Sequence, residues 1–225
     1  MFDQFAQLPF VPQPEVGKKP FFWGNAVQNI QPIPRLWNGT SLEQPLSRNF
    51  LFDLGEDPAA SNAMVALCIF AWGGMRANHA QLLFSEPNWP ILDELIGVLR
   101  RKELNSPAEV FELFHVPRQQ NSLPGLGIAY YSKLIYFLST HLDVFILDQW
   151  IGKSMNLFHG ENLISFTGNW VNDSNDGERY AIFCEHMMNY AHQLNMDKHS
   201  FEQKMFCRGG RNPGPWRSIV KQNLA

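Results

Sequence analysis

Apolar residues recur every three or four positions along most of the chain after about residue 57, a spacing typical of helices that bury one face. This pattern predicts helices over residues 92–99, 128–138 and 178–193. Polar residues 172–177 interrupt the pattern, which predicts a loop. Together these segments predict an all-α protein.

One predicted helix is apolar on nearly all sides. Asp57 and Pro58 suit an N-cap and a first helical position, and the apolar run 64–72 follows them. Because no face of this run is polar, we expect a buried central helix that ends at Gly73 and Gly74.

Capping residues indicate two more helix starts. Residues 106–109, Ser-Pro-Ala-Glu, form a capping box and predict a helix through Phe114. Asp148 stands before Gln149 and predicts the N-cap of a later helix.

The N-terminal quarter of the chain has a different character. Seven prolines interrupt it, which excludes long helices, and no alternating run stronger than Phe50-Leu51-Phe52 predicts a strand. We therefore expect two parts: an irregular, Pro-rich region over residues 1–56, packed on a helical body over residues 57–225.

Composition narrows the class of protein. Hydrophobic residues make up 45% of the 225, which is ample for a core, and no apolar run approaches the roughly 20 residues that span a bilayer. The N-terminus lacks the layout of a secretion signal. We expect a cytoplasmic protein that does not contact a membrane.

Cysteine and histidine give no sign of a metal site. Cys68, Cys184 and Cys207 are far apart and odd in number, which predicts reduced thiols without metal-ligand spacing. Cys184 and His186 form a weak pair that we expect to face a helix interior. We predict no metal and no cofactor.

The formal net charge is −3, but two segments are locally basic. Residues 100–102 form one cluster. From Asp197 onward six basic residues stand against two acidic ones, 6 − 2 = +4. Either cluster fits a solvated face as well as a DNA-facing one. The six basic residues of the second cluster are Lys198, Lys204, Arg208, Arg211, Arg217 and Lys221.

The stretch 123–127, Leu-Pro-Gly-Leu-Gly, precedes the helix predicted over 128–138. Gly125 and Gly127 allow the main chain to approach a ligand closely, and the amides of Leu126, Gly127 and Ile128 would form an anion cradle at the helix N-terminus. On DNA that anion is a phosphate, and such a contact positions the duplex without reading its sequence. A tight turn without a ligand explains the stretch equally well.

Asp148 follows Gly127 by 148 − 127 = 21 residues, which leaves room for one helix and a short connection. A plain N-cap explains this residue, but backbone donors also hold a capping carboxylate rigid and ionised. Such a carboxylate can stabilise a sugar cation.

At these residues the chain resembles the helix-hairpin-helix DNA glycosylases, and more closely the bacterial proteins with an 8-oxoguanine DNA glycosylase fold. Residues 123–127 and 146–148 carry the resemblance, residues 131–137 and 194–206 extend it, and it covers about residues 57–207. The resemblance implies a monomer that kinks double-stranded DNA, flips out one nucleotide and cuts its N-glycosidic bond, with Asp148 as the catalytic residue.

The chain departs from this family pattern in two places. Members that also cleave the strand carry a lysine where this chain has Ala129, so we expect a monofunctional enzyme. Lys133 follows one turn later and is a displaced candidate for an imine-forming lysine; a DNA contact or a surface position is the alternative. Residues 116–122 separate the capped helix from the hairpin, so its first helix should be short or displaced.

Glycosylases with this fold insert a wedge from a loop after the buried early helix, which corresponds to residues 73–79. Arg76, Asn78 and His79 could hydrogen-bond to the orphaned base, and Met75 could insert between base steps. A polar loop between helices is the alternative.

The resemblance implies repair of oxidised guanine or a related lesion. The departures leave open a hypermodified base in phage DNA, such as a modified cytosine, and hence a role in antiviral defence. Two readings without catalysis remain: a helix-hairpin-helix DNA-binding module, and a structural helical protein whose turn is accidental.

Overall fold

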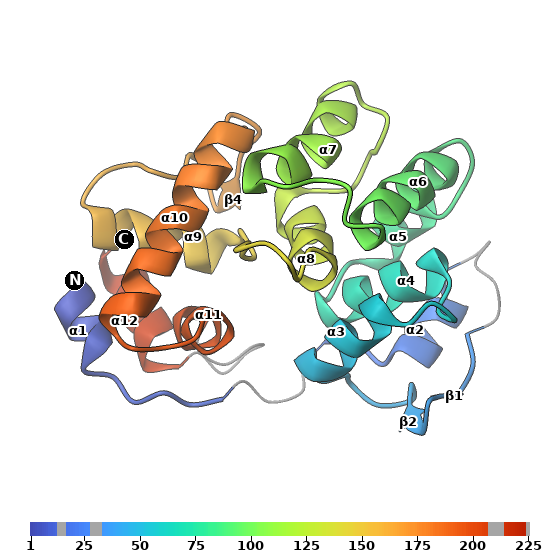
Figure 1. The fold of residues 1–225 in the computed structure, drawn as a ribbon, viewed down its shortest axis with the longest axis horizontal. Coiled ribbons are helices and arrows are strands. Elements are labelled where there is room, and N and C mark those ends of the chain that lie inside the picture. Colours follow the sequence, from blue (N-terminus) through green and yellow to red (C-terminus); the bar gives the residue numbers. More distant parts are fainter. Residues whose placement is uncertain (13–16, 28–32, 207–213, 224–225) are drawn as a thin grey trace.

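The computed structural model describes residues 1–12, 17–27, 33–206 and 214–223 (Figure 1). The protein is all-α, as predicted, with two very short hairpins. Its helices are α1 (Phe2–Ala6), α2 (Pro20–Asn25), α3 (Arg48–Glu56), α4 (Asn62–Trp72), α5 (Ala77–Leu83), α6 (Asn88–Arg100), α7 (Pro107–Gln119), α8 (Ile128–Leu138), α9 (Gln149–His159), α10 (Gly177–Gln193), α11 (Lys198–Phe206) and α12 (Pro215–Asn223). The antiparallel strand pairs are β1 (Leu36–Trp37) with β2 (Thr40–Ser41), and β3 (Phe166–Thr167) with β4 (Trp170–Val171).

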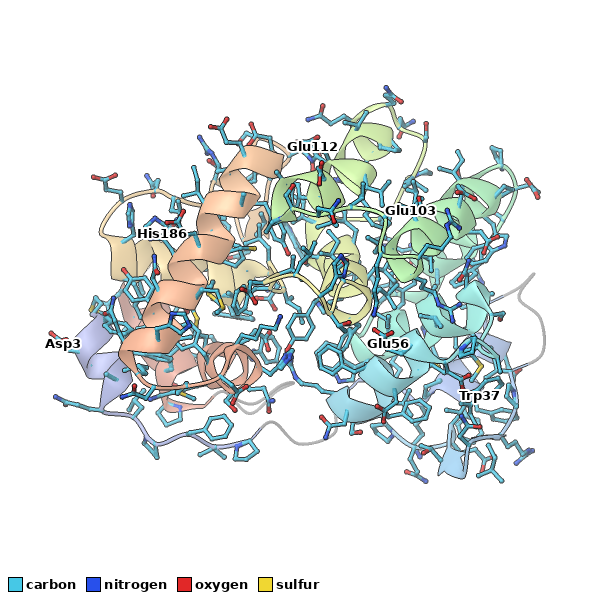
Figure 2. All side chains as sticks on the ribbon, viewed as in Figure 1. Asp3, Trp37, Glu56, Glu103, Glu112 and His186 are labelled. Atoms are coloured by element: carbon cyan, nitrogen blue, oxygen red, sulfur yellow. The ribbon has the colours of Figure 1, made fainter. Side chains whose placement is uncertain are left out.

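Helix α4 is the buried central helix that the sequence predicts, with every residue from Met64 to Trp72 buried. Its predicted start was wrong. Ser61 is the N-cap, and its Oγ accepts a hydrogen bond from the Met64 amide at 3.2 Å. Asp57 instead ends α3, and its carboxylate accepts hydrogen bonds from Trp37, the last residue of β1, and from Asn38 after it (Trp37 in Figure 2).

The other periodic segments fold as predicted into α6, α7, α8 and α10. The capping box is present, with Ser106 Oγ accepting from the Glu109 amide at 3.2 Å. The expectation of a short or displaced first helix was wrong, because α7 continues through Pro117 to Gln119. A proline so close to a helix end removes only one hydrogen bond near the terminus.

The described part of the N-terminal region contains three short helices and packs on both sides of the molecule (Figure 1). In α1, the ring centroid of Phe2 lies 5.3 Å from that of Phe158 on α9, and the ring centroid of Phe5 lies 5.1 Å from that of Trp216 on α12. Helices α2 and α3 pack instead against α4, and α3 also packs against α8. The nine-residue α3, capped by Ser47, is a helix that the sequence pattern did not predict.

The helices form two groups, α2 to α6 on one side and α1 with α9 to α12 on the other, with α7 and α8 between them (Figure 1). Helices α7 and α10 approach closely, because a Cβ on Gly177 would lie 2.7 Å from the Ala108 carbonyl oxygen. Glu112 of α7 accepts a hydrogen bond from the Gly177 amide at 2.5 Å (Glu112 in Figure 2).

The side chains of the basic cluster at residues 100–102 are bonded within the fold. Arg100 donates to the carbonyl oxygens of Gly55, Asp57 and Ala60. Arg101 pairs with Glu94 and Glu103, and Lys102 pairs with Glu56 at 2.9 Å (Glu56 and Glu103 in Figure 2). The DNA-facing alternative for this cluster is therefore not supported.

Cys68 and Cys184 are free, buried thiols, and burial raises the pKa of each to about 12. His186 contacts the ring of His159 at 4.6 Å. Cys207 lies outside the described residues. Within the described ranges no group of side chains could hold a metal ion, and no helix has the length and apolar character to cross a membrane.

Candidate active site

A cavity of about 600 Å³ opens where the N-termini of α8 and α9 meet the turn between α4 and α5. This volume falls within the range of about 300 to 1,000 Å³ typical of small-molecule sites. Its described lining carries four cationic side chains, those of Arg76, Arg118, Lys133 and Arg217, and one acidic side chain, that of Asp148. The local charge is thus opposite in sign to the net charge of the chain.

The stretch 123–127 forms a hairpin at one wall of this cavity. Gly125 has a positive φ of 86°, and a Cβ there would lie 3.4 Å from that of His79. Gly127 is the N-cap of α8, and open space surrounds the place its Cβ would occupy. The amides at this helix start have no partner within the helix and point out of its N-terminus.

One part of the predicted amide cradle was wrong. The Leu126 side chain is fully buried, and its amide donates to the Leu123 carbonyl at 3.2 Å, which closes the turn. Its own carbonyl accepts a hydrogen bond from Arg118 at 3.0 Å. Of the three predicted donors, the amides of Gly127 and Ile128 are left for an anion.

Asp148 is the N-cap of α9, as predicted, and lines the same cavity. Its Oδ1 accepts hydrogen bonds from the amides of Trp150 at 2.8 Å and Ile151 at 3.0 Å. Its Oδ2 accepts none from the described residues. The side chain is only 8% exposed, so one oxygen is fixed by the helix and the other is left for the cavity.

The chain that leads into Asp148 is anchored on both sides. The Leu147 amide donates to Ser132 Oγ on α8 at 3.0 Å. Tyr180 on α10 donates its hydroxyl to the Phe145 carbonyl at 2.6 Å. Residues 144–147 are buried, so the position of Asp148 relative to α8 is set by a rigid connection.

Lys133 lies beside Asp148 in the cavity wall and is 7% exposed, which excludes the surface position left open by the sequence. Its Nζ donates to the Ala129 carbonyl at 2.6 Å. Burial lowers the pKa of Lys133, and the nearby Asp148 carboxylate counteracts part of that effect. A Cβ on Gly73 would lie 2.9 Å from Lys133 Cδ, so the lysine stem packs against the turn after α4.

The turn between α4 and α5 differs from the loop expected over residues 73–79. Met75 is fully buried and cannot insert into DNA, so that prediction was wrong. Asn78 is exposed on α5 and does not line the cavity, whereas Arg76 and the half-buried His79 do. Sequence alone could not separate these residues, because α5 begins at Ala77 within the expected loop.

An ion pair between Arg48 and Glu202, 2.5 Å apart, is buried close enough to the site to influence it electrostatically. Glu202 is fully buried, and burial raises its pKa, an effect that Arg48 opposes. The charge of Asp148 disfavours ionised Glu202, and that of Lys133 favours it. Sequence reasoning missed this pair, since 154 positions separate its members along the chain (202 − 48).

Trp150 forms another part of the cavity wall that the sequence did not assign. The Arg217 guanidinium lies 4.6 Å from its ring centroid, and Lys153 and Lys221 lie at 5.5 and 5.6 Å. Lys198 and Lys204 of the C-terminal basic segment donate instead to the carbonyls of Leu142 and Ala6. Arg208 and Arg211 lie outside the described residues.

A family model described as "Putative 8-oxoguanine DNA glycosylase OGG-like protein" matches residues 11–206. No curated protein and no solved structure matches the chain. The matched segment contains the hairpin, Lys133 and Asp148, and it spans most of the chain. The chain therefore belongs to this family of OGG-like proteins.

Proposed function

We propose that this protein is a DNA glycosylase that flips one base out of duplex DNA and hydrolyses its N-glycosidic bond. Membership of a DNA glycosylase family implies DNA binding. The observation that carries the proposal is the placement of Asp148, a nearly buried carboxylate with one oxygen fixed, in a cationic cavity beside an N-terminal amide hairpin.

The hairpin supplies the anchor for the DNA. A phosphate at the N-terminus of α8 accepts hydrogen bonds from the amides of Gly127 and Ile128, and the positive end of the helix dipole attracts it. Arg76, an exposed cation at the cavity, adds charge attraction. These contacts ignore base identity, so they hold any duplex in register while the cavity tests the extruded nucleotide.

Asp148 supplies the chemistry. As the bond between C1′ and the base nitrogen breaks, the electron pair leaves with the base and positive charge develops on the sugar. The fixed carboxylate stabilises that charge without reorganising, because its Oδ1 is already hydrogen-bonded. A water then adds to C1′ and gives its proton to Oδ2. That proton passes on to the departed base anion, which leaves a neutral base, an abasic site and an ionised Asp148.

Lys133 acts as a positioned cation in this proposal. It offsets the negative charge of Asp148 in a wall from which water is largely excluded, and its hydrogen bond to Ala129 ties the amine to α8. The reaction is hydrolysis alone, with no imine between Lys133 and C1′.

Oxidised guanine is the first candidate base, in line with the family description. A second candidate is a base that carries a large substituent, such as a hypermodified cytosine of phage DNA, which a cavity of about 600 Å³ has room to admit. In the first case the enzyme serves base-excision repair, and in the second it serves antiviral defence.

Asp148→Asn tests the proposal. Asparagine caps helices as well as aspartate does, so the fold should be retained while the negative charge is lost. We expect the wild type to produce abasic sites, revealed as strand breaks by alkali, in duplexes with 8-oxoguanine or in phage DNA with modified cytosine. The variant should be at least about 100-fold slower.

Asp53→Asn is the matched control, because Asp53 is an exposed aspartate on α3. The Asp53→Asn variant should produce abasic sites at the wild-type rate. If the wild type leaves no abasic sites in any of these DNAs, or if Asp148→Asn acts as fast as the wild type, the protein is not this glycosylase and a binding module becomes the better description.

A further inference from the structure

Trp170, in strand β4, is the most exposed large hydrophobic side chain in the described part of the chain, at 69%. It lines the cavity at its rim. Exposing a tryptophan to water forgoes the burial that a side chain of this size normally gains. A fold that keeps such a ring at the mouth of a cationic cavity indicates that a ligand covers it.

The hairpin that carries Trp170 is rigid despite its two-residue strands. The Asn156 side chain on α9 donates a hydrogen bond to the Ile164 carbonyl and accepts one from the Ile164 amide, each at 2.8 Å. Asn175 does the same for Ser165, at 2.9 Å on each side. The turn itself contains Gly168 with a positive φ of 58°. The exposed ring thus stands on a braced support.

Arg118 connects this support to the hairpin at 123–127. Its guanidinium forms a two-point contact with Asp173, at 2.8 and 3.0 Å, just after β4. The same group donates to the Leu126 carbonyl at 3.0 Å. One residue therefore fixes the distance between Trp170 and the predicted phosphate contact at Gly127.

The opposite rim offers no comparable ring or apolar wedge. Met75 is fully buried, and Lys18 donates to its carbonyl at 2.7 Å, which holds that turn in place. Tyr130 and Trp150 line the cavity but are half-buried. Among the described residues of the lining, Trp170 alone is a large apolar side chain that is exposed.

We propose that Trp170 is the residue that inserts into the duplex and fills the space left by the extruded nucleotide. This inference rests on the proposed glycosylase function. A flat aromatic ring can stack between neighbouring base pairs, and the exposed Arg76, which lines the same cavity, matches the charge of the flanking phosphates. The insertion thus comes from the β3–β4 hairpin and not from the turn after α4.

Two labelled duplexes test the assignment: one with a central tetrahydrofuran abasic analogue, which provides the empty space, and the same duplex intact. Trp170→Ala should weaken binding to the analogue duplex by about 5- to 150-fold, the loss of one aromatic stacking contact, and change binding to the intact duplex little. Trp170→Phe should keep most of the affinity. Leu36→Ala, which removes a side chain 61% exposed and outside the cavity lining, should bind both duplexes as the wild type does.

Equal losses on both duplexes would make Trp170 a general surface contact, and no loss on either would exclude it from the interface; both outcomes overturn the assignment. Abasic-site production by the same proteins separates this result from the proposed function. The wild type could excise no base while Trp170→Ala still loses affinity for the analogue duplex alone. In that case the assignment of Trp170 as the inserted residue is retained and the glycosylase proposal is wrong. If excision occurs and Trp170→Ala binds normally, only the insertion falls.

Discussion

Asp148 and Lys133 face the same cavity, but their surroundings differ in kind. The carboxylate of Asp148 accepts hydrogen bonds from two backbone amides at one oxygen. Its other oxygen accepts none from the described residues. The amine of Lys133 is buried against Gly73 and tied to one carbonyl, and burial lowers its pKa. The spacing of these residues is visible in the sequence, whereas their burial is not.

The role of Lys133 can be tested with borohydride, which reduces an imine to a stable covalent link. Because Nζ is held by the Ala129 carbonyl and hydrolysis needs no imine, we expect no adduct when the wild type is incubated with abasic-site DNA and borohydride. Denaturing electrophoresis detects such an adduct. An adduct that forms with the wild type and disappears in Lys133→Met would show that Lys133 attacks the sugar.

At the scale of elements, periodicity and capping located six of the twelve helices that the structure describes. The helices at 107–119 and 177–193 carry their own signals, because each buries one face along its length. The helix at 128–138 is buried on all sides from Tyr131 to Leu138, and its apolar residues predicted it. Helices α3 and α5 were missed because they are short and lie among turn-forming residues. The β3–β4 hairpin was missed because two-residue strands have no detectable alternation.

The contact between α7 and α10 gives a prediction at this scale. A Cβ on Gly177 would lie 2.7 Å from the Ala108 carbonyl, so Gly177→Ala should lower the free energy of unfolding by about 1 to 3 kcal/mol. Gly97→Ala is the matched control in α6, since its Cβ would meet only the flexible end of Arg101 and an Asn62 side chain.

Gly97→Ala should leave the protein unchanged or stabilise it by up to about 1 kcal/mol, the helix preference of alanine over glycine. Urea unfolding measures both variants. Equal stability of the two would mean that α10 shifts away from α7 at no cost.

At the scale of the molecule, the two groups of helices are joined by buried polar contacts. Arg48 on α3 pairs with Glu202 on α11, and Tyr136 on α8 hydrogen-bonds to His199 on α11 at 2.7 Å. The ring of His199 also packs against Phe52 at 4.8 Å. These contacts fix α11 against α3, in the other group of helices, and against the central α8.

This junction should make stability depend on pH. Burial, with Lys198 and Arg48 nearby, lowers the pKa of His199 below its ordinary 6.5, and burial also lowers that of His186. As the pH falls below about 6.5, the unfolded chain takes up protons that the folded chain does not, so the free energy of unfolding decreases. Above that pH these histidines are neutral in both states, and their contribution to the free energy of unfolding is fully present.

Urea unfolding at about pH 7.5 and pH 5.5 measures this dependence. His199→Gln should reduce the loss of stability between the two conditions, and His192→Gln, at an exposed position on α10, should leave it as in the wild type. An identical loss in all three proteins would show that His199 does not titrate differently in the folded and unfolded states.

The sequence by itself determined the local features of this protein. Helical periodicity, the Leu-Pro-Gly-Leu-Gly hairpin and the 21-residue step from Gly127 to Asp148 are properties of adjacent or nearly adjacent residues, so they can be read without a structure. Tertiary structure decided what each side chain faces. It buried Met75, left Trp170 exposed, and brought Arg48 to Glu202 and Arg217 to Trp150. Such contacts join residues far apart in the chain, and only the packing of the whole molecule specifies them.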